Sequence, residues 1–188
     1  IGGTTKAATT SIFRYFSDHP EVSSSSIKET RFFLDDNYPL IKPSSYSSDI
    51  KNYELYFKDE KGEDILMDAT PDYLYSLNAP ARMKETLSEE PKIVFILRNP
   101  LTRLFSWHNF AKQLDMTGNI SFAEFISLQI ENDGDKQFKR AMEQGKYYKY
   151  LINYYNHFDE KNILILTYED LLKNEVEVVK KISLFLTI

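Results

Sequence analysis

Cysteine is absent from this chain of 188 residues, and histidine occurs only at positions 19, 108 and 157. Without cysteine the chain can form no disulfide, no thiolate nucleophile and no Cys-ligated zinc site, and the scattered histidines argue against a histidine metal cluster. We therefore expect chemistry without a metal ion. Because disulfide bonds mark oxidising compartments, the missing cysteines also favour a cytoplasmic location.

Long apolar runs and a basic charge balance are missing too. No stretch approaches the roughly 20 apolar residues of a membrane helix, and we identify no signal peptide and no transmembrane segment. The 23 Lys and Arg residues are outnumbered by 28 Asp and Glu residues, which gives a net charge of -5. Proteins that neutralise many phosphates usually carry a basic surface, so we expect no nucleic-acid partner. A local basic pocket is compatible with this balance.

Aromatic residues, in contrast, are plentiful, with 13 Tyr and 13 Phe in a chain that is 42% hydrophobic. This composition indicates a folded chain with an apolar core, and the length suits one domain rather than two. We therefore expect residues 1–188 to form a single domain. The chain begins at Ile1–Gly3 as if within a strand and ends within a helical pattern, so we expect both ends to be trimmed.

Short aliphatic runs alternate with helical patterns along the chain. The predicted strands are the stub at Ile1 and residues 65–67, 93–97 and 163–166. Helical spacing covers residues 10–19, 101–114 and 176–186, and the capping-box sequence Ser121–Glu124 begins a further helix. This alternation predicts an α/β fold, with a central parallel sheet flanked by helices in three layers. The serine- and tyrosine-rich stretch 42–61 is interpreted as an insertion near the site entrance.

A first candidate binding motif directly follows the first predicted strand and opens a helix. In this loop Lys6 supplies a mobile cation, and Thr9, Thr10 and Ser11 supply hydroxyl donors. A turn of this kind also directs backbone N–H groups and the positive end of a helix dipole at one point, which suits a phosphate or a sulfate. The P-loop of kinases and NTPases fits less well, because its lysine directly precedes the Ser or Thr. The structural alternative is a plain helix cap at Thr9 or Thr10.

A second candidate motif follows the third predicted strand. An arginine at a strand end can grip a phosphate through two parallel hydrogen bonds, and a serine further along the next helix can join it. Arg98 and Ser106 supply this pair. The alternative is a solvated arginine before a helix that starts at Pro100. Because ligands of parallel sheets bind at the carboxyl ends of strands, we expect the two motifs to hold opposite ends of one nucleotide.

Together the two motifs resemble those of the sulfotransferases that use 3′-phosphoadenosine 5′-phosphosulfate (PAPS). The 5′-phosphosulfate loop of that family reads approximately P-K-x-G-T-[TS], and its 3′-phosphate motif approximately R-[DN]-P-x-x-R-x-x-S-x-Y. This chain reads T-K-A-A-T-T at residues 5–10 and R-N-P-L-T-R-L-F-S-W-H at residues 98–108. Similarity at Lys28–Glu29 with Phe32–Phe33, at Thr70–Tyr73 and at Tyr168–Leu171 extends the resemblance over essentially the whole chain. The Lys-Glu element is most similar to the glycan-modifying and bacterial branch.

The chain departs from the family pattern at three positions. Ala8 stands where the loop usually has glycine, so the backbone there either avoids positive φ or carries strain. Thr5 replaces a proline, and His108 replaces the tyrosine of the Ser-x-Tyr element. The family's later segment, which helps to cover the adenine and the 3′-phosphate, is not among these residues, so we expect a complete enzyme to extend beyond Ile188.

The resemblance implies a P-loop-like nucleotide fold and the transfer of the sulfuryl group of PAPS, as co-substrate, to an acceptor hydroxyl on a glycan, a lipid or a small metabolite. It assigns donor binding to Lys6, Ala7, Ala8, Thr9, Thr10, Ser11, Arg98 and Ser106. Lys6 would also stabilise the charge that develops in the reaction. Glu29 is the candidate base, and Lys28 is a candidate contact of the sulfuryl group or of an anionic acceptor. A surface Lys–Glu pair is the alternative.

Other interpretations stay open at the sequence level. Asp68 and Thr70, just past the second strand, are candidates for contact with the acceptor, and a helix cap at Thr70 explains them equally well. A P-loop-type small-molecule kinase would need magnesium and an acidic residue after a strand, for which Asp68 is available. A nucleotide-binding pseudoenzyme would bind the desulfated nucleotide without transferring a group. The acceptor, with carbohydrate among the candidates, and the oligomeric state are not determined by the sequence.

Overall fold

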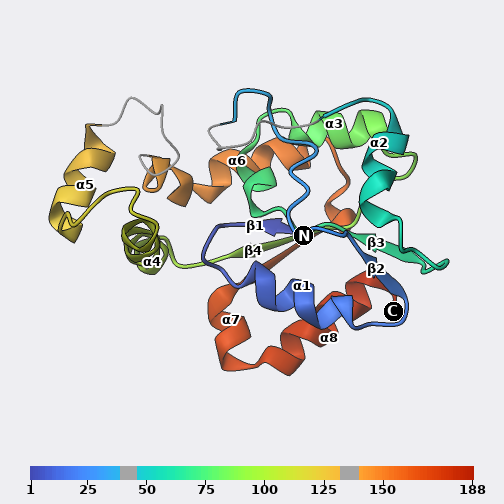
Figure 1. Ribbon diagram of the computed structural model, residues 1–188. Coiled ribbons are helices and arrows are strands. Elements are labelled where there is room, and N and C mark those ends of the chain that lie inside the picture. Colours follow the sequence, from blue (N-terminus) through green and yellow to red (C-terminus); the bar gives the residue numbers. More distant parts are fainter. Residues whose placement is uncertain (39–45, 132–139) are drawn as a thin grey trace.

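The computed structural model describes residues 1–38, 46–131 and 140–188, and strands alternate with helices along them (Figure 1). The strands are β1 Gly2–Gly3, β2 Val22–Ser24, β3 Ile65–Met67, β4 Ile93–Leu97 and β5 Ile163–Thr167. The α-helices are α1 Thr9–Ser17, α2 Ile50–Glu54, α3 Ala79–Thr86, α4 Pro100–Gln113, α5 Phe122–Ile130, α6 Tyr147–Tyr155, α7 Tyr168–Lys173 and α8 Glu175–Leu186. Short 3-10 helices are η1 Leu55–Phe57, η2 Pro71–Tyr75, η4 Glu143–Gly145 and η5 Glu160–Asn162.

The strands pair in parallel throughout. β4 lies between β1 and β5, with Gly2 opposite Phe95, and β2 pairs with β3. The backbone nitrogen of Ile1 lies 2.5 Å from the carbonyl oxygen of Asp68, so β3 lies beside β1 and the two sheets continue each other. The parallel α/β architecture predicted from the alternation of elements is therefore confirmed.

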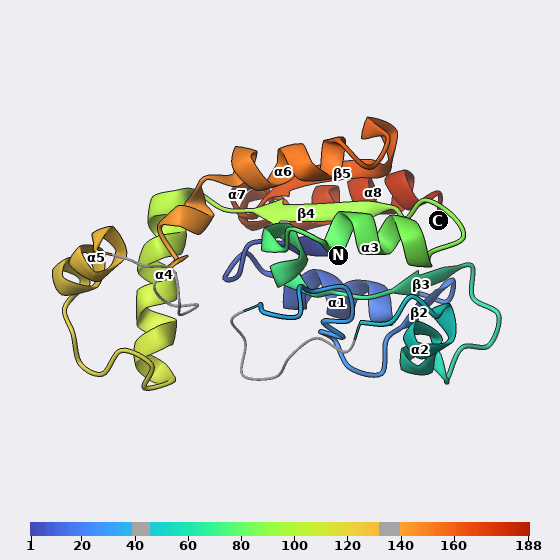
Figure 2. The same ribbon diagram turned by 90° about the horizontal axis from the view of Figure 1, so that it is seen from above.

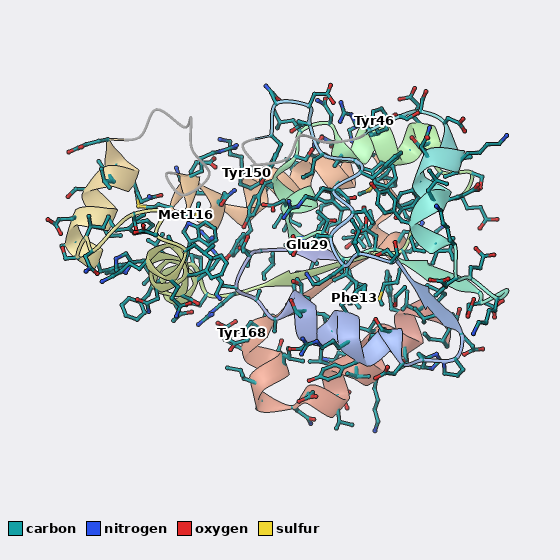
Figure 3. The ribbon with its side chains drawn as sticks, in the orientation of Figure 1. Phe13, Glu29, Tyr46, Met116, Tyr150 and Tyr168 are labelled. Atoms are coloured by element: carbon teal, nitrogen blue, oxygen red, sulfur yellow. The ribbon has the colours of Figure 1, made fainter. Side chains whose placement is uncertain are left out.

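Helices cover both faces of this sheet. Figure 1 shows α1, α7 and α8 on one face and α3 and α6 on the other, and Figure 2 gives the same layers from above. Along β4 the side chains alternate between two apolar clusters: Phe95 packs with α3 and α6, whereas Val94 and Ile96 pack with α1, α7 and α8. Figure 3 shows Tyr150 and Phe13 on these opposite sides. A strand buried on both faces explains the continuous apolar run 93–97.

Helices α4 and α5 form a separate apolar contact at one end of the sheet (Figure 2). Leu104, Trp107 and Phe125 are buried in it. The capping box predicted at the start of α5 is confirmed, because Ser121 accepts from the Glu124 backbone N–H while the Glu124 carboxylate accepts from the Ser121 N–H. No helix in the part of the chain that the structure describes is long and apolar enough to cross a membrane.

The structure differs from the predicted elements in a few places. β2 was not predicted, since its Val-Ser-Ser sequence has little aliphatic character and its strand conformation comes from pairing with β3. α1 ends at Ser17, two residues earlier than predicted. Of the stretch 42–61, residues 42–45 lie outside the described residues, and the remainder contains α2 and η1. Tyr53 of this stretch packs on Phe33, with ring centroids 4.8 Å apart.

Candidate functional site

The candidate residues lie where the parallel strands end. Lys6 follows β1, Lys28 and Glu29 follow β2, Asp68 and Thr70 follow β3, and Arg98 follows β4. Because the strands are parallel, these segments share the carboxyl edge of the sheet. This edge is where α/β proteins bind their ligands.

The loop after β1 has an unusual backbone conformation. Lys6 and Ala8 both have left-handed conformations, with φ of 72° and 62°. Ala8 is the N-cap of α1, and no side chain in the described residues caps that helix. The alternative that Thr9 or Thr10 serves as the cap is therefore not supported. The first N–H groups of α1, free of a capping side chain, can accept an anion.

Arg98 lies against this loop. Its Nη1 donates to the backbone oxygen of Lys6 at 2.9 Å, and its Nε donates to Thr102 Oγ1 at 3.3 Å. The guanidinium carbon lies 4.5 Å from the centroid of the Tyr168 ring, in a cation–π contact. The two motifs, 92 residues apart in sequence, are thus joined by a direct hydrogen bond.

Three aromatic residues at this site were not predicted from the sequence. Besides Tyr168, the Tyr147 hydroxyl donates to the carbonyl of Arg98 at 2.7 Å, and the Phe110 ring lies 4.4 Å from the Lys6 ammonium. Burial raises the pKa of Tyr147, which keeps its hydroxyl a donor. Two signals could have indicated Tyr168: its position directly after a strand and its place in the Tyr168–Leu171 element of the resemblance. Tyr147 and Phe110 are placed by tertiary packing alone.

Acidic residues that follow β5 make contacts at the same carboxyl edge of the sheet. The Asn99 backbone N–H donates to Glu169 Oε1 at 3.0 Å. The N-cap of α7 is Thr167, whose hydroxyl accepts from the Asp170 N–H while donating to the Asp170 carboxylate. Glu169 therefore fixes the segment that carries Arg98.

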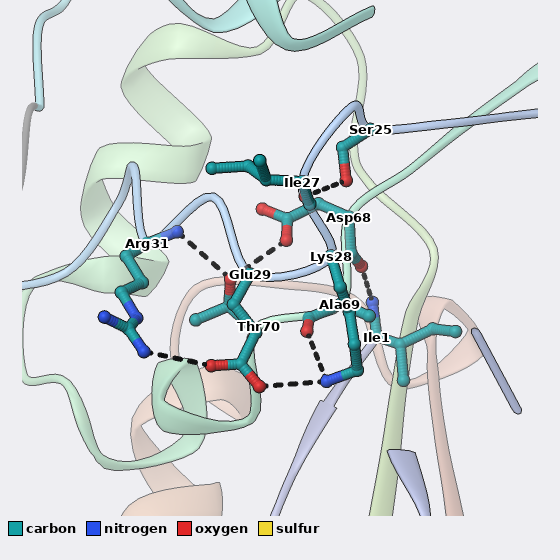
Figure 4. Close-up of polar contacts among 9 residues, drawn as sticks. All are labelled: Ile1, Ser25, Ile27, Lys28, Glu29, Arg31, Asp68, Ala69 and Thr70. Carbon is teal, nitrogen blue, oxygen red and sulfur yellow. Dashed lines mark hydrogen bonds and ion pairs between the residues drawn. The ribbon is translucent and has the colours of Figure 1, made fainter. Parts of the chain in front are cut away.

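Lys28 and Glu29 form part of a short chain of charges. Lys28 Nζ lies 3.0 Å from one Glu29 oxygen, and Arg31 Nη2 lies 3.3 Å from the other. Lys28 Nζ also donates to the carbonyl oxygen of Ala69 at 3.2 Å, as Figure 4 shows. The Glu29 side chain retains about a third of its exposed area, 32%, so the carboxylate is held by two cations yet reachable from outside.

Asp68 and Thr70 are buried, with 7% and 0% of their surfaces exposed. The Thr70 hydroxyl donates to Asp68 Oδ1 at 2.9 Å rather than capping the helix that starts at Pro71. Contact of either residue with an acceptor stays a prediction, and their burial favours an internal role.

The other residues that were predicted to bind the donor differ in how exposed they are. Ala7 and Thr9 are buried, Thr10 is exposed, and Ser11 is half-buried at the start of α1. Ser106 is half-buried on α4 and makes no hydrogen bond to Arg98 within the described ranges. The participation of Ser106 in phosphate binding stays a prediction.

A parallel sheet that ends in an uncapped turn beside a lysine and an arginine is typical of α/β proteins that bind an anionic ligand at the carboxyl edge of the sheet. The family follows from comparison with known proteins. The model of the sulfotransferase domain family matches residues 1–188, so the chain belongs to that family.

Individual relatives agree with this assignment. The heparan sulfate glucosamine 3-O-sulfotransferase 3B1 of Mus musculus is 26% identical over 189 residues, which are 99% of this chain and 45% of the relative. The luciferin sulfotransferase of Photinus pyralis is 27% identical over 99 residues, 53% of this chain and 24% of the relative. The chain thus spans less than half the length of these two curated relatives.

Solved structures share the fold. A sulfotransferase from Alicyclobacillus acidocaldarius superposes with a TM-score of 0.86 at 25% identity, covering 100% of this chain and 79% of that one. A mouse sulfotransferase complexed with PAP superposes with a TM-score of 0.58 at 18% identity, covering 99% of this chain and 56% of that one. The P-loop-like α/β fold predicted for this chain is therefore confirmed.

Proposed function

We propose that this chain transfers the sulfuryl group of PAPS to a hydroxyl of an acceptor. The observation that carries the proposal is the 2.9 Å hydrogen bond from Arg98 Nη1 to the backbone oxygen of Lys6, which brings the two halves of the expected donor site together. Membership of the sulfotransferase family supports the reaction type, and the PAP complex of the mouse neighbour supports the nucleotide.

The residues present fit a bisphosphate nucleotide. The uncapped N-terminus of α1 and the Lys6 ammonium would hold the 5′-phosphosulfate, because N–H groups and a cation favour negative charge. Arg98 would hold the 3′-phosphate, since its guanidinium can present two parallel donors to one phosphate. Ser106, on the helix that follows Arg98, would add a hydroxyl donor.

The same residues can stabilise the reaction. The acceptor oxygen forms a bond to sulfur as the bond from sulfur to the bridging phosphate oxygen breaks, so negative charge grows on the departing nucleotide. Lys6 and the N–H groups after Ala8 would stabilise this charge. Glu29 takes the proton that the acceptor hydroxyl loses, and Lys28 directs the Glu29 carboxylate through their 3.0 Å contact.

The acceptor that we propose is a carbohydrate hydroxyl. The match to the mouse heparan sulfate enzyme extends over 99% of this chain, whereas the match to the luciferin enzyme covers 53%. A heparan sulfate oligosaccharide is therefore the first acceptor to test, with p-nitrophenol as the small phenolic comparison.

The donor assignment is tested by calorimetry with adenosine 3′,5′-bisphosphate (PAP) and, separately, ATP. We expect the wild-type protein to prefer PAP, and Arg98→Ala to weaken PAP binding by about 10- to 100-fold, because hydrogen bonds to charged groups contribute about 1.5–3 kcal/mol. Arg98→Lys should fall between, since it keeps the charge without the paired donors. Arg14→Ala, at an exposed position on α1, is the matched control. Equal affinity for ATP and PAP, or an unchanged Arg98→Ala variant, would contradict the donor assignment.

Glu29 is tested by turnover. We expect Glu29→Gln to lower kcat for PAP release from PAPS by about 100-fold or more, because a positioned general base contributes about 10²–10⁴-fold. PAP affinity should change little, since Glu29 lies outside the donor loop. The control is Glu21→Gln, which alters an exposed glutamate. Turnover within a few-fold of the wild type, in a folded variant, would remove Glu29 from the mechanism.

A further inference from the structure

A buried cluster of polar side chains lies directly beneath the loop that carries Glu29. Asp68 Oδ2 accepts from the Thr30 hydroxyl at 2.5 Å and from the Tyr73 hydroxyl at 2.8 Å. The Thr30 and Tyr73 hydroxyls are themselves 2.9 Å apart. All three side chains are buried, and we call them the Thr30–Asp68–Tyr73 cluster.

The cluster also bonds to the backbone on the carboxyl side of Glu29. The Phe32 N–H donates to Thr30 Oγ1 at 3.3 Å, and the Phe33 N–H donates to the Tyr73 hydroxyl at 3.4 Å. The hydroxyls therefore fix main-chain positions as well as a carboxylate. A loop held in this way has few alternative conformations.

Further hydrogen bonds tie the same loop to the end of β3. The Arg31 N–H donates to Thr70 Oγ1 at 3.2 Å, and Thr70 donates in turn to Asp68 (Figure 4). On the other side of Glu29, the Ala69 N–H donates to the carbonyl of Lys28 at 3.0 Å. The backbone is thus anchored both before and after Glu29.

Arg31 shows why such anchoring is needed. Its φ is 57°, a left-handed conformation that costs a residue with a side chain roughly 1–2 kcal/mol. That conformation turns the chain so that Arg31 Nη2 reaches Glu29 at 3.3 Å. An unfavourable backbone conformation persists only where surrounding contacts over-determine it.

We propose that the Thr30–Asp68–Tyr73 cluster is a positioning device that holds Lys28 and Glu29 in the geometry needed for sulfuryl transfer. The inference rests on the proposed function, and it gives Asp68 a role other than contact with the acceptor. Both Asp68 oxygens accept from internal hydroxyls, from Thr30 and Tyr73 on one and from Thr70 on the other.

The electrostatics of the cluster agree with that role. Burial raises the pKa of Asp68, while the Ile1 ammonium and hydrogen bonds from hydroxyls, those of Thr30 and Tyr73 among them, favour its charged form. Burial, together with the neighbouring Asp68 charge, raises the pKa of Tyr73 well above its usual value, so the tyrosine remains a donor. Removing one hydroxyl would leave a buried acceptor short of a partner, which disturbs the loop above it.

The experiment compares Thr30→Val with Thr30→Ser. Valine keeps the shape of threonine and removes the hydroxyl, whereas serine keeps the hydroxyl. Turnover is measured as PAP release from PAPS, with a heparan sulfate oligosaccharide and with water as acceptor, and PAP affinity is measured by calorimetry. We expect Thr30→Val to lower kcat about tenfold or more, while its PAP affinity and its KM for PAPS stay within about twofold of the wild type. Thr30→Ser should retain at least a third of the wild-type kcat.

Each outcome is decisive. The inference is wrong if Thr30→Val keeps the wild-type kcat, or if the valine and serine variants lose kcat equally. It is also wrong if Thr30→Val loses PAP affinity in parallel with kcat. If Thr30→Val does not fold, Tyr73→Phe removes a second donor to Asp68 and should give the same kcat-specific loss. A wild-type protein that binds no PAP, or that releases none from PAPS with either acceptor, refutes the proposed function itself, and the inference falls with it.

Discussion

At the scale of single residues, Ala8 shows how the donor loop departs from an unstrained turn. It has φ of 62° and ψ of 25° at the N-cap of α1, a left-handed conformation that glycine adopts without cost. The methyl group of alanine makes this conformation less favourable by roughly 1 kcal/mol. In this conformation no side-chain cap covers the first N–H groups of α1.

We expect Ala8→Gly to raise the free energy of unfolding by about 0.5–1 kcal/mol, because relief of strain outweighs the greater freedom of glycine in the unfolded chain. PAP should bind at least as tightly as to the wild type, since the backbone donors keep their places. Urea unfolding measures the change in stability, and calorimetry measures the PAP affinity.

The matched control is Ala7→Gly. Ala7 is buried and has no positive φ, so glycine there should lower the stability by roughly 0.5–1 kcal/mol or more. The same substitution at adjacent residues should thus have opposite signs. A destabilised Ala8→Gly variant would show that the methyl group of Ala8 contributes packing that exceeds the strain.

At the scale of elements, local sequence patterns predicted the strands and helices whose signal is intrinsic. The run 93–97 is apolar throughout because β4 is buried on both faces, and the Ser121–Glu124 box carries its own helix-starting hydrogen bonds. β2 escaped prediction because Val22–Ser24 becomes a strand only through its partner β3. Pairing across 43 positions, as between Val22 and Ile65, has no local sequence signal.

The residues of the candidate site also differ in whether a local sequence pattern or tertiary packing places them. Lys6 and Arg98 follow strands, so topology alone predicts that they meet, and the hydrogen bond between them agrees. Tyr147 and Phe110 lie on helices, and their contacts with Arg98 and Lys6 depend on how those helices pack. The role assigned to Glu29 came from resemblance and that of Ser106 from its place on the helix after Arg98, and both stay predictions.

At the scale of the whole molecule, the closeness of β1 to β4 depends on the two glycines of β1: Gly3 lies against the Ile96 backbone and Gly2 beneath the Phe95 ring. A Cβ atom at Gly2 would lie 2.6 Å from Cε1 and 2.9 Å from Cδ1 of Phe95. Phe95 is fully buried and packs edge-on against Tyr154 of α6, with ring centroids 4.7 Å apart. The layer of helices above the sheet thereby determines which residue β1 can carry.

Gly2→Ala should therefore lower the free energy of unfolding by roughly 1–3 kcal/mol, the usual cost of overpacking in a core, because the new methyl group would collide with the Phe95 ring. In a Phe95→Leu background the smaller side chain leaves room for the methyl group, so the same substitution should cost less than about 1 kcal/mol there. Urea unfolding of the four proteins in this cycle measures the coupling between the two sites. If the effects of the two substitutions on the free energy of unfolding are additive, the backbone of β1 shifts to make room for the methyl group. The position of Lys6, just beyond β1, would then be set by its loop and not by the packing of the sheet.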